Sequence, residues 1–301
     1  MIVDGHLHVF RPATADYPRP VDDLAPAGRE APVEDLLRVM DGAGVDRAVL
    51  VPLGPQDRYV AECRSAHPDR FAAIGVADDA LLGGVPGTNP VDALDRRVAA
   101  GGLSGFRVNH LGTPGRPVTS APLWPVLQRM AATGLVLWCY VPPAQLPLLD
   151  DALRALPGLR VVLNHLGFCP PAGASGTSWD LVVDAHGRPR IPAGIPPPTL
   201  PDVLRLARHP GVHVHFSGQY AVSRTEFPYT DLDPLAHALY DAYGAGRMLW
   251  ASDYPWTRDV PGYDRLPELV DRQLPWLTGA ERADVLGGSA GRLFTDVWGD
   301  A

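Results

Sequence analysis

The chain has 301 residues, of which 46% are hydrophobic and 20% are charged, and these proportions are typical of a soluble globular protein. A formal charge of −8 argues against a nucleic-acid-binding protein, which needs a basic surface to meet the phosphates. All 26 basic residues are arginine, so chemistry that requires a lysine, such as a Schiff base or a lysine that bridges two metal ions, is excluded.

The sequence shows no sign of a membrane or secretory segment. No apolar run reaches the length of a membrane span, and the first residues, MIVDGHLH, lack the basic and apolar regions of a signal peptide. The three cysteines, Cys63, Cys139 and Cys169, are too few and too widely spaced for a disulfide framework or a Cys-rich zinc site. We therefore expect a cytoplasmic protein.

Short apolar runs alternate along the chain with amphipathic segments. The runs are nearly continuous, which is typical of parallel strands buried on both faces. Strands are predicted over residues 1–8, 46–52, 71–78, 103–109, 135–141, 159–167, 212–218 and 247–255. Helices are predicted between them, over residues 32–44, 58–68, 89–102, 121–134, 146–158, 200–211, 228–246, 266–277 and 278–294.

This alternation predicts an α/β fold, a distorted (β/α)8 TIM barrel that forms one domain over residues 1–301. The alternative is an open doubly wound sheet. Its nucleotide-binding form needs a glycine-rich loop after the first strand, and the sequence has none there. The barrel is therefore favoured.

One connection, residues 168–199, is unusually long and rich in Pro and Gly. The stretch LVVDAHGRPRI within it predicts a small hairpin around a glycine turn. Because the insertion follows a strand, we expect it at the C-terminal face of the barrel, as a lid whose Trp179 contacts substrate. A variable or oligomerising insertion is the alternative.

The first predicted strand contains two histidines that are two residues apart, His6 and His8. Side chains alternate along a strand, so both imidazoles point to the same side and can hold one ion or one substrate atom. The alternative is a solvated turn with two surface histidines. The apolar residues on either side favour the strand.

Polar residues also occur at the ends of five other predicted strands. They are Arg107, Tyr140, His165, His215 and Asp253. In a parallel barrel these ends meet at one mouth, where three histidines and an aspartate match the ligands that Zn²⁺ prefers. Taken singly, each residue has a structural alternative, such as an Asx turn for Asp253 or a buried structural role for His165.

Three motifs, VDGHLHVF, NHLG and RMLWASDYPW, together with the ending VLGGSAGRLF, resemble the amidohydrolase superfamily. The resemblance is strongest to the amidohydrolase-2 type metal-dependent hydrolases, the branch that contains 2-pyrone-4,6-dicarboxylate lactonase, sulfomuconolactone hydrolase and sugar lactonases. It covers the whole chain except the predicted lid. It implies a hydrolase that opens a lactone or related ester of a small carboxylated or sugar-like substrate.

The resemblance also implies roles for the candidate residues. Asp253 activates water as general base, Arg107 binds a substrate carboxylate, and Tyr140 orients the substrate. The metal ligands it implies are His6, His8, His165 and Asp253, which hold one divalent ion; Zn²⁺ is expected first, Mn²⁺ is the alternative, and a metal-free mechanism in which the histidines polarise the carbonyl stays open.

The sequence departs from the branch at several positions. His215 replaces a lysine and is a candidate acid or base, while Thr113 and Ala221 stand where the dicarboxylate lactonase has arginines. Arg224, near the second of these, is a candidate substrate ligand. A substrate with a single carboxylate, or a sugar-like or aromatic lactone, is therefore expected.

The rival within the superfamily is a zinc-dependent non-oxidative decarboxylase of the aminocarboxymuconate-semialdehyde or resorcylate type. Decarboxylation needs protonation of a carbon atom, so a strand-seven histidine at the site favours it. A non-enzymatic binding protein on a decayed barrel predicts the loss of site residues, and all of them are present. We expect a small-molecule partner, with neither nucleic acid nor membrane, and leave a homo-oligomer open.

Overall fold

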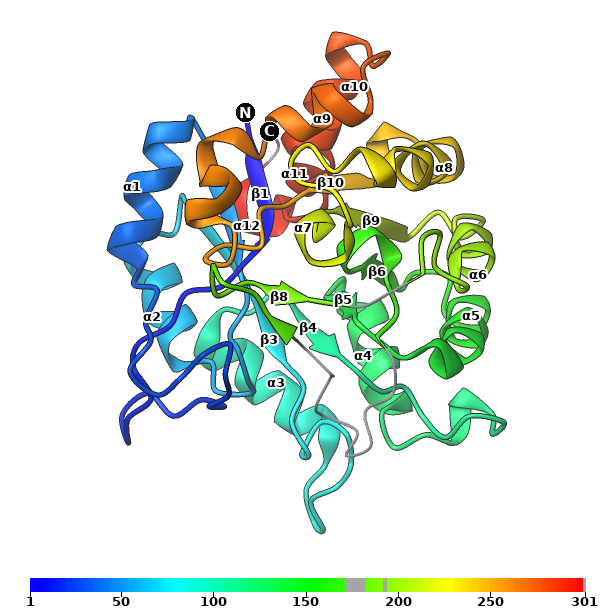
Figure 1. Ribbon diagram of the computed structural model, residues 1–301. Coiled ribbons are helices and arrows are strands. Elements are labelled where there is room, and N and C mark those ends of the chain that lie inside the picture. The colour runs from blue at the N-terminus through cyan, green and yellow to red at the C-terminus, as the bar shows by residue number, and fades with distance from the viewer. Residues whose placement is uncertain (171–181, 192–193, 300–301) are drawn as a thin grey trace.

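The computed structural model describes residues 1–170, 182–191 and 194–299. Eight parallel strands form a nearly closed barrel with helices around it, which confirms the predicted (β/α)8 architecture (Figure 1). The strands lie in the barrel in chain order: β1 (Val3–Leu7), β2 (Arg47–Leu50), β3 (Phe71–Val76), β4 (Gly105–Val108), β5 (Val136–Cys139), β6 (Arg160–Leu163), β9 (Val212–Phe216) and β10 (Met248–Trp250).

Helices lie between the strands as predicted. They are α1 (Val33–Ala43), α2 (Arg58–Ala66), α3 (Pro90–Gly101), α4 (Trp124–Thr133), α5 (Leu146–Ala155), α6 (Leu200–Leu206), α7 (Gln219–Val222), α8 (Asp233–Tyr243), α9 (Glu268–Gln273), α10 (Gly279–Ala283), α11 (Ser289–Leu293) and α12 (Thr295–Trp298). Two short helices, α7 and α12, lie outside the predicted ranges. Helix α1 begins and ends where the proline and the glycine of its sequence predict. Pro32 precedes its first turn, and Gly44 ends it in the left-handed conformation. In the described parts of the chain, no helix combines the length and the apolarity that crossing a membrane requires.

The predicted hairpin is also present. Strands β7 (Val182–Val183) and β8 (Pro189–Arg190) pair antiparallel across a turn that contains Gly187 at φ 71°. The hairpin belongs to the 168–199 insertion. Trp179, which the sequence suggested as a substrate contact, lies outside the described residues.

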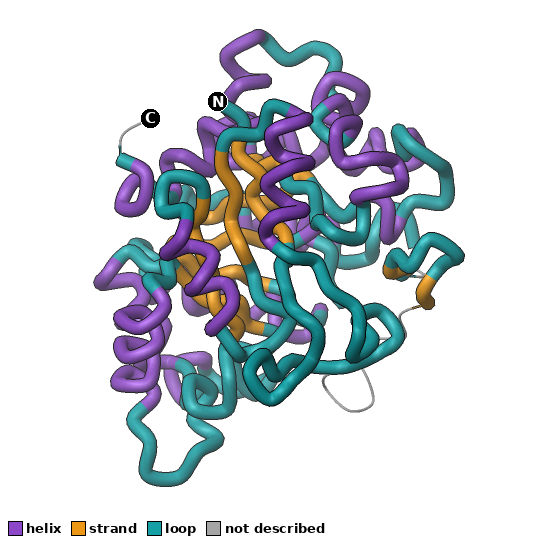
Figure 2. Tube along the Cα trace, turned by 90° about the vertical axis from the view of Figure 1, so that its left-hand side faces the viewer, coloured by secondary structure: helices purple, strands orange, loops and turns teal. Residues whose placement is uncertain are grey.

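Two apolar layers hold the barrel together. The inner layer fills the barrel with side chains that alternate along the strands, including Val49, Ile74, Trp138 and Val162. The outer layer lies between the strands and the surrounding helices. Strands that are buried on both faces have few polar positions, so polar side chains gather where the strands end. The long loops that follow the strands lie together at one end of the molecule (Figure 2).

The barrel closes between β10 and β1 by hydrogen bonds that involve the chain just after β10. The Asp253 amide donates to the carbonyl of His6 at 3.0 Å, and the His8 amide donates to the carbonyl of Tyr254 at 2.7 Å. The Asp4 carboxylate strengthens this seam by accepting the Ser252 amide at 2.9 Å. The strand that carries the two histidines is thereby tied to the segment that carries Asp253.

Asp4 predicts a pH dependence of stability. Its carboxyl is fully buried, and burial raises its pKa from 3.8 to about 6, although hydrogen bonds from Ser252 and Tyr263 act in the opposite direction. A pKa that is higher in the folded state favours folding while the group is protonated. This contribution is fully present below pH 3.8 and is lost as the pH rises through about 6.

We therefore expect the wild type to lose stability relative to Asp4→Asn as the pH rises from 4 to 7, by at most about 3 kcal/mol. The amide oxygen of asparagine can still accept the Ser252 amide, so the variant should fold. The free energy of unfolding, measured by denaturant titration at several pH values, checks this. Asp241→Asn, at an exposed position of α8, is the control. A wild-type-minus-variant difference that does not change with pH would contradict the prediction.

Candidate active site

The site is built from side chains at the C-terminal ends of β1, β6 and β10. His6 and His8 both face the Asp253 carboxylate, with Nε2 to Oδ1 distances of 3.7 Å and 3.5 Å. The Nε2 atom of His165 lies 4.0 Å from the other carboxylate oxygen. The structure thus brings together the four residues that the sequence placed at one mouth.

An unusual backbone conformation directs the side chains of His165 and Asp253 into the site. Asp253 and His165 have φ values of 58° and 46°, in the left-handed region that residues other than glycine seldom adopt. His165 also packs against Gly218, where an added Cβ would lie 2.7 Å from the His165 Cβ. Strained residues of this kind persist where the surroundings hold them, and they cluster at functional sites.

The two histidines of β1 have opposite hydrogen-bond partners. His8 Nδ1 lies 2.7 Å from the carbonyl oxygen of Val51, which can only accept, so Nδ1 carries the proton and Nε2 has a free lone pair. His6 Nδ1 instead lies 3.1 Å from Nε1 of Trp138. An indole N–H can only donate, so His6 Nδ1 is the acceptor, and the proton of the neutral ring is on Nε2.

The buried groups differ in charge. Burial lowers the pKa of His6 well below its usual value, so that ring is neutral at neutral pH, and burial also lowers the pKa of His165. The pKa of Asp253 is lowered to about 2: burial alone would raise it, but His165, His8 and a hydrogen bond from Tyr220 lower it more. The site therefore presents a carboxylate that is held ionised among imidazole rings.

Tyr220 is the site residue that the sequence reasoning missed. It lies on α7, directly after β9, and its buried hydroxyl donates to Asp253 Oδ2 at 2.6 Å. Burial and the neighbouring carboxylate raise its pKa well above 10, so it remains a donor. Nothing in the sequence around Tyr220 shows where its side chain points.

Two adjoining cavities open beside the cluster. The inner one, of about 120 Å³, is lined by His8, His165, Asp253 and Tyr220, and by apolar side chains such as Trp256. The outer one, of about 750 Å³, is bordered by Asp22 and Asp23. Arg107 and Tyr140, the predicted substrate ligands, line both cavities, as does Leu24.

The cover over the inner cavity comes from two segments far apart in the sequence. Leu24 belongs to the loop of residues 11–31, and Pro189 and Ile191 belong to the hairpin region of the insertion. Arg29 joins the two segments, because its guanidinium donates to the carbonyls of Leu24 at 2.6 Å and Gly187 at 3.2 Å. It also lies over the ring of Trp256, 4.8 Å from the ring centre.

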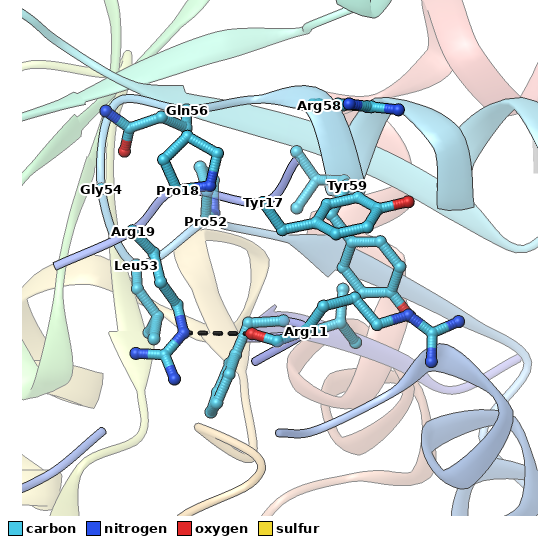
Figure 3. A pocket seen from close by; sticks show the side chains of 13 residues that line it. Arg11, Tyr17, Pro18, Arg19, Pro52, Leu53, Gly54, Gln56, Arg58 and Tyr59 are labelled. Carbon is cyan, nitrogen blue, oxygen red and sulfur yellow. Dashed lines mark hydrogen bonds between the residues drawn. The ribbon is translucent and has the colours of Figure 1, made fainter. Parts of the chain in front are cut away.

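A second arginine organises the 11–31 loop from inside. The guanidinium of Arg19 donates to six backbone carbonyls, including that of Arg11 at 3.1 Å (Figure 3). Beside it lies a small cavity of about 40 Å³, whose wall includes Tyr17 and Tyr59. None of the predicted site residues lines this cavity, so we assign it to the packing of the loop.

Two predicted site residues lie away from both substrate cavities. His215 is fully buried beneath the cluster, where its ring lies 5.3 Å from that of His6 and 5.1 Å from that of Trp138. Arg224 is exposed, and its backbone amide donates to Asp231 at 2.8 Å. Neither is among the described residues that line the two cavities.

The arrangement could hold one divalent ion. One atom each of His6, His8 and Asp253 lie within 4.8 Å of one another, and all three residues are buried. Two of the facing atoms, His6 Nε2 and Asp253 Oδ1, have no hydrogen-bond partner in the described chain. Imidazole nitrogen and carboxylate oxygen suit Zn²⁺. The donor set and the spacing therefore fit a single ion. The hydrogen bond from Trp138 to His6 opposes it, because that bond leaves the proton of the His6 ring on Nε2, the atom that would bind the ion.

Comparison with known proteins identifies the family. A family model described as "Amidohydrolase" matches residues 3–295. The chain belongs to the amidohydrolase family. This confirms the resemblance inferred from the motifs, and it makes the protein a hydrolytic enzyme.

Two curated relatives of this amidohydrolase act on lactones according to their names. The L-fucono-1,5-lactonase of Burkholderia ambifaria is 25% identical over 259 residues, covering 85% of this chain and 81% of that protein. The 4-sulfomuconolactone hydrolase of Rhizobium radiobacter is 26% identical over 306 residues, covering 97% of this chain and 89% of that protein. At the family level, these relatives support lactone hydrolysis.

Solved structures show the same fold. An amidohydrolase of Burkholderia multivorans with bound zinc has a TM-score of 0.70 at 23% identity, covering 98% of this chain and 99% of the other. The 5-carboxyvanillate decarboxylase of Sphingomonas paucimobilis has a TM-score of 0.61 at 16% identity, covering 97% and 98%. Both likenesses concern the fold alone.

Tyr220 gives a first test of the site. Tyr220→Phe removes one hydrogen bond to a carboxylate, and such bonds are worth about 1.5–3 kcal/mol, so we expect kcat to fall by about 10- to 100-fold. Because the ring is kept, KM should change little. Tyr243→Phe is the matched control, since that buried hydroxyl donates to the carbonyl of Val203 instead. Equal kcat values for Tyr220→Phe and the wild type would contradict the assigned role.

Proposed function

We propose that this amidohydrolase opens a lactone, or a related ester, of a small carboxylated or sugar-like substrate. The observation that carries the proposal is the ionised Asp253, which lines the inner cavity beside His8 and His165. A buried carboxylate that is held ionised can take a proton from water. A neutral imidazole that carries its proton on the nitrogen facing the substrate can polarise a carbonyl by donating to its oxygen.

In the proposed reaction, the lactone enters the inner cavity with its carbonyl toward the histidines. Asp253 accepts a proton from a water molecule, and the water oxygen attacks the carbonyl carbon. Tyr220 holds the carboxylate through Oδ2. A divalent ion, if the group of His6, His8 and Asp253 held one, would supply Lewis acidity to the carbonyl. As the ring ester bond breaks, Asp253 gives the proton to the leaving ring oxygen, and a hydroxy acid is released.

The lining of the inner cavity supports a substrate with one carboxylate. Arg107 is the only arginine among the described residues that line it, and Ala221 stands there without charge. Guanidinium suits a planar carboxylate. Asp22 and Asp23 at the outer cavity would repel a second carboxylate.

The decarboxylase rival is less well supported by the site. A decarboxylase must protonate carbon, and the strand-seven histidine that could do this, His215, does not line the described cavities. Incubation with lactones and with hydroxybenzoates, with acid release and carbon dioxide release measured separately, distinguishes the two reactions. Carbon dioxide without net hydrolysis would overturn the proposal.

Asp253→Asn tests the general base. We expect hydrolysis to fall by about 100-fold or more while the fold is kept, since asparagine has a similar shape but cannot take the proton. Circular dichroism and the thermal midpoint report the fold, and Asp241→Asn on the exposed face of α8 is the matched control. Near-normal turnover by the variant would rule out this mechanism.

Arg107→Gln tests the substrate class. For a lactone with one carboxylate we expect KM to rise by about 10- to 100-fold, the effect of losing a charge-assisted hydrogen bond. For a neutral sugar lactone of similar size KM should change by less than about threefold, because no charge pair is lost. The KM ratio of the two substrates is the measurement. An equal loss on both would show that Arg107 does not select a carboxylate.

A further inference from the structure

The His6-x-His8 pair would ordinarily be assigned one role, because both rings face the same carboxylate. Their distal nitrogens show two roles instead. A histidine that binds a metal almost always donates its other ring N–H to a carbonyl, a carboxylate or water, and His8 does this toward Val51. His6 accepts at the equivalent nitrogen, from Trp138.

The Trp138 bond and a metal bond at His6 Nε2 exclude each other in a neutral ring. Neutral imidazole has one lone pair for a ligand and one N–H. If Nδ1 accepts from the indole, the lone pair is used there and Nε2 carries the proton. Metal binding at Nε2 would move the proton to Nδ1, where it would meet the indole N–H, and two donors would face each other.

Trp138 has little freedom to leave. It is fully buried on β5, between the rings of His215 at 5.1 Å and Phe294 at 5.8 Å. An indole N–H that loses its partner inside a protein is costly to leave unpaired. His6 is equally enclosed, with no exposed surface and no place in the lining of either substrate cavity.

We propose that Trp138 holds His6 in the tautomer that presents Nε2–H to Asp253. The Nε2–H of His6 then faces the Asp253 carboxylate at 3.7 Å, and Trp138 weakens metal binding at the group formed by His6, His8 and Asp253. His8 and Asp253 keep their free lone pairs. The proposal concerns the state of the site and does not depend on the identity of the substrate.

The tautomer can be read in the wild-type protein without changing Trp138. Long-range ¹H–¹⁵N correlation spectra of the ¹⁵N-histidine-labelled, chelator-treated protein show which ring nitrogen carries the proton, and His6→Gln assigns the signals. We expect His6 to carry its proton on Nε2 and His8 to carry it on Nδ1. A His6 ring protonated on Nδ1 would overturn the proposal, whatever the enzyme hydrolyses.

Zinc affinity gives the second test. Trp138→Phe removes the donor but keeps an aromatic ring in the core, so His6 is free to bind through Nε2. We expect the Kd for Zn²⁺, measured by competition with a chromophoric chelator, to fall by about tenfold or more, which is the scale of effects on metal affinity from residues behind the ligands. An unchanged Kd would overturn the proposal.

Two controls isolate this effect. Trp250→Phe removes a buried indole on β10 whose N–H donates to the carbonyl of Leu266, so its Kd for Zn²⁺ should equal that of the wild type. His6→Ala should weaken zinc binding strongly in the Trp138→Phe background and only slightly in the wild-type background. A large loss in the wild-type background would show that His6 is already a ligand and would overturn the proposal.

Discussion

The site depends on how the barrel closes. Strands β10 and β1 are the last and first of the sheet, and the amide of Asp253 and the carbonyl of His6 join them by a backbone hydrogen bond of 3.0 Å. The same seam places the Asp253 carboxylate within 4 Å of the Nε2 atoms of His6 and His8. Asp4 holds the seam from below through Ser252. The contacts that close the barrel therefore also bring Asp253 to the two histidines.

This dependence explains how much of the molecule the sequence could predict. Strands that are buried on both faces must be apolar throughout, so eight apolar runs were enough to predict the barrel. Polar residues at the ends of those runs had to meet at one mouth, and His6, His8, His165 and Asp253 do. Both deductions use only the parallel order of the strands, which is a property of the whole fold.

The features that the sequence did not show depend on the direction and depth of single side chains. Tyr220 reaches Asp253 because α7 begins after Gly218, whose φ of 80° turns the chain. Arg224, four residues further on, is exposed, and its role as a substrate ligand stays a prediction. His215 was expected at the mouth, yet its ring lies one layer below, against Trp138. Periodicity gives the face of a strand but not the depth of a side chain in the barrel.

Which ring nitrogen of each histidine donates and which accepts is even harder to predict from the sequence. His6 and His8 are identical in type, two residues apart, on one strand and facing one carboxylate, so the motif alone implies one function for both. The difference arises on other strands, where a carbonyl follows β2 behind His8 and an indole on β5 lies behind His6. A carbonyl leaves the facing nitrogen free to bind a cation, and an indole leaves it protonated. A metal-binding motif is thus specified as much by what lies behind its ligands as by the ligands themselves.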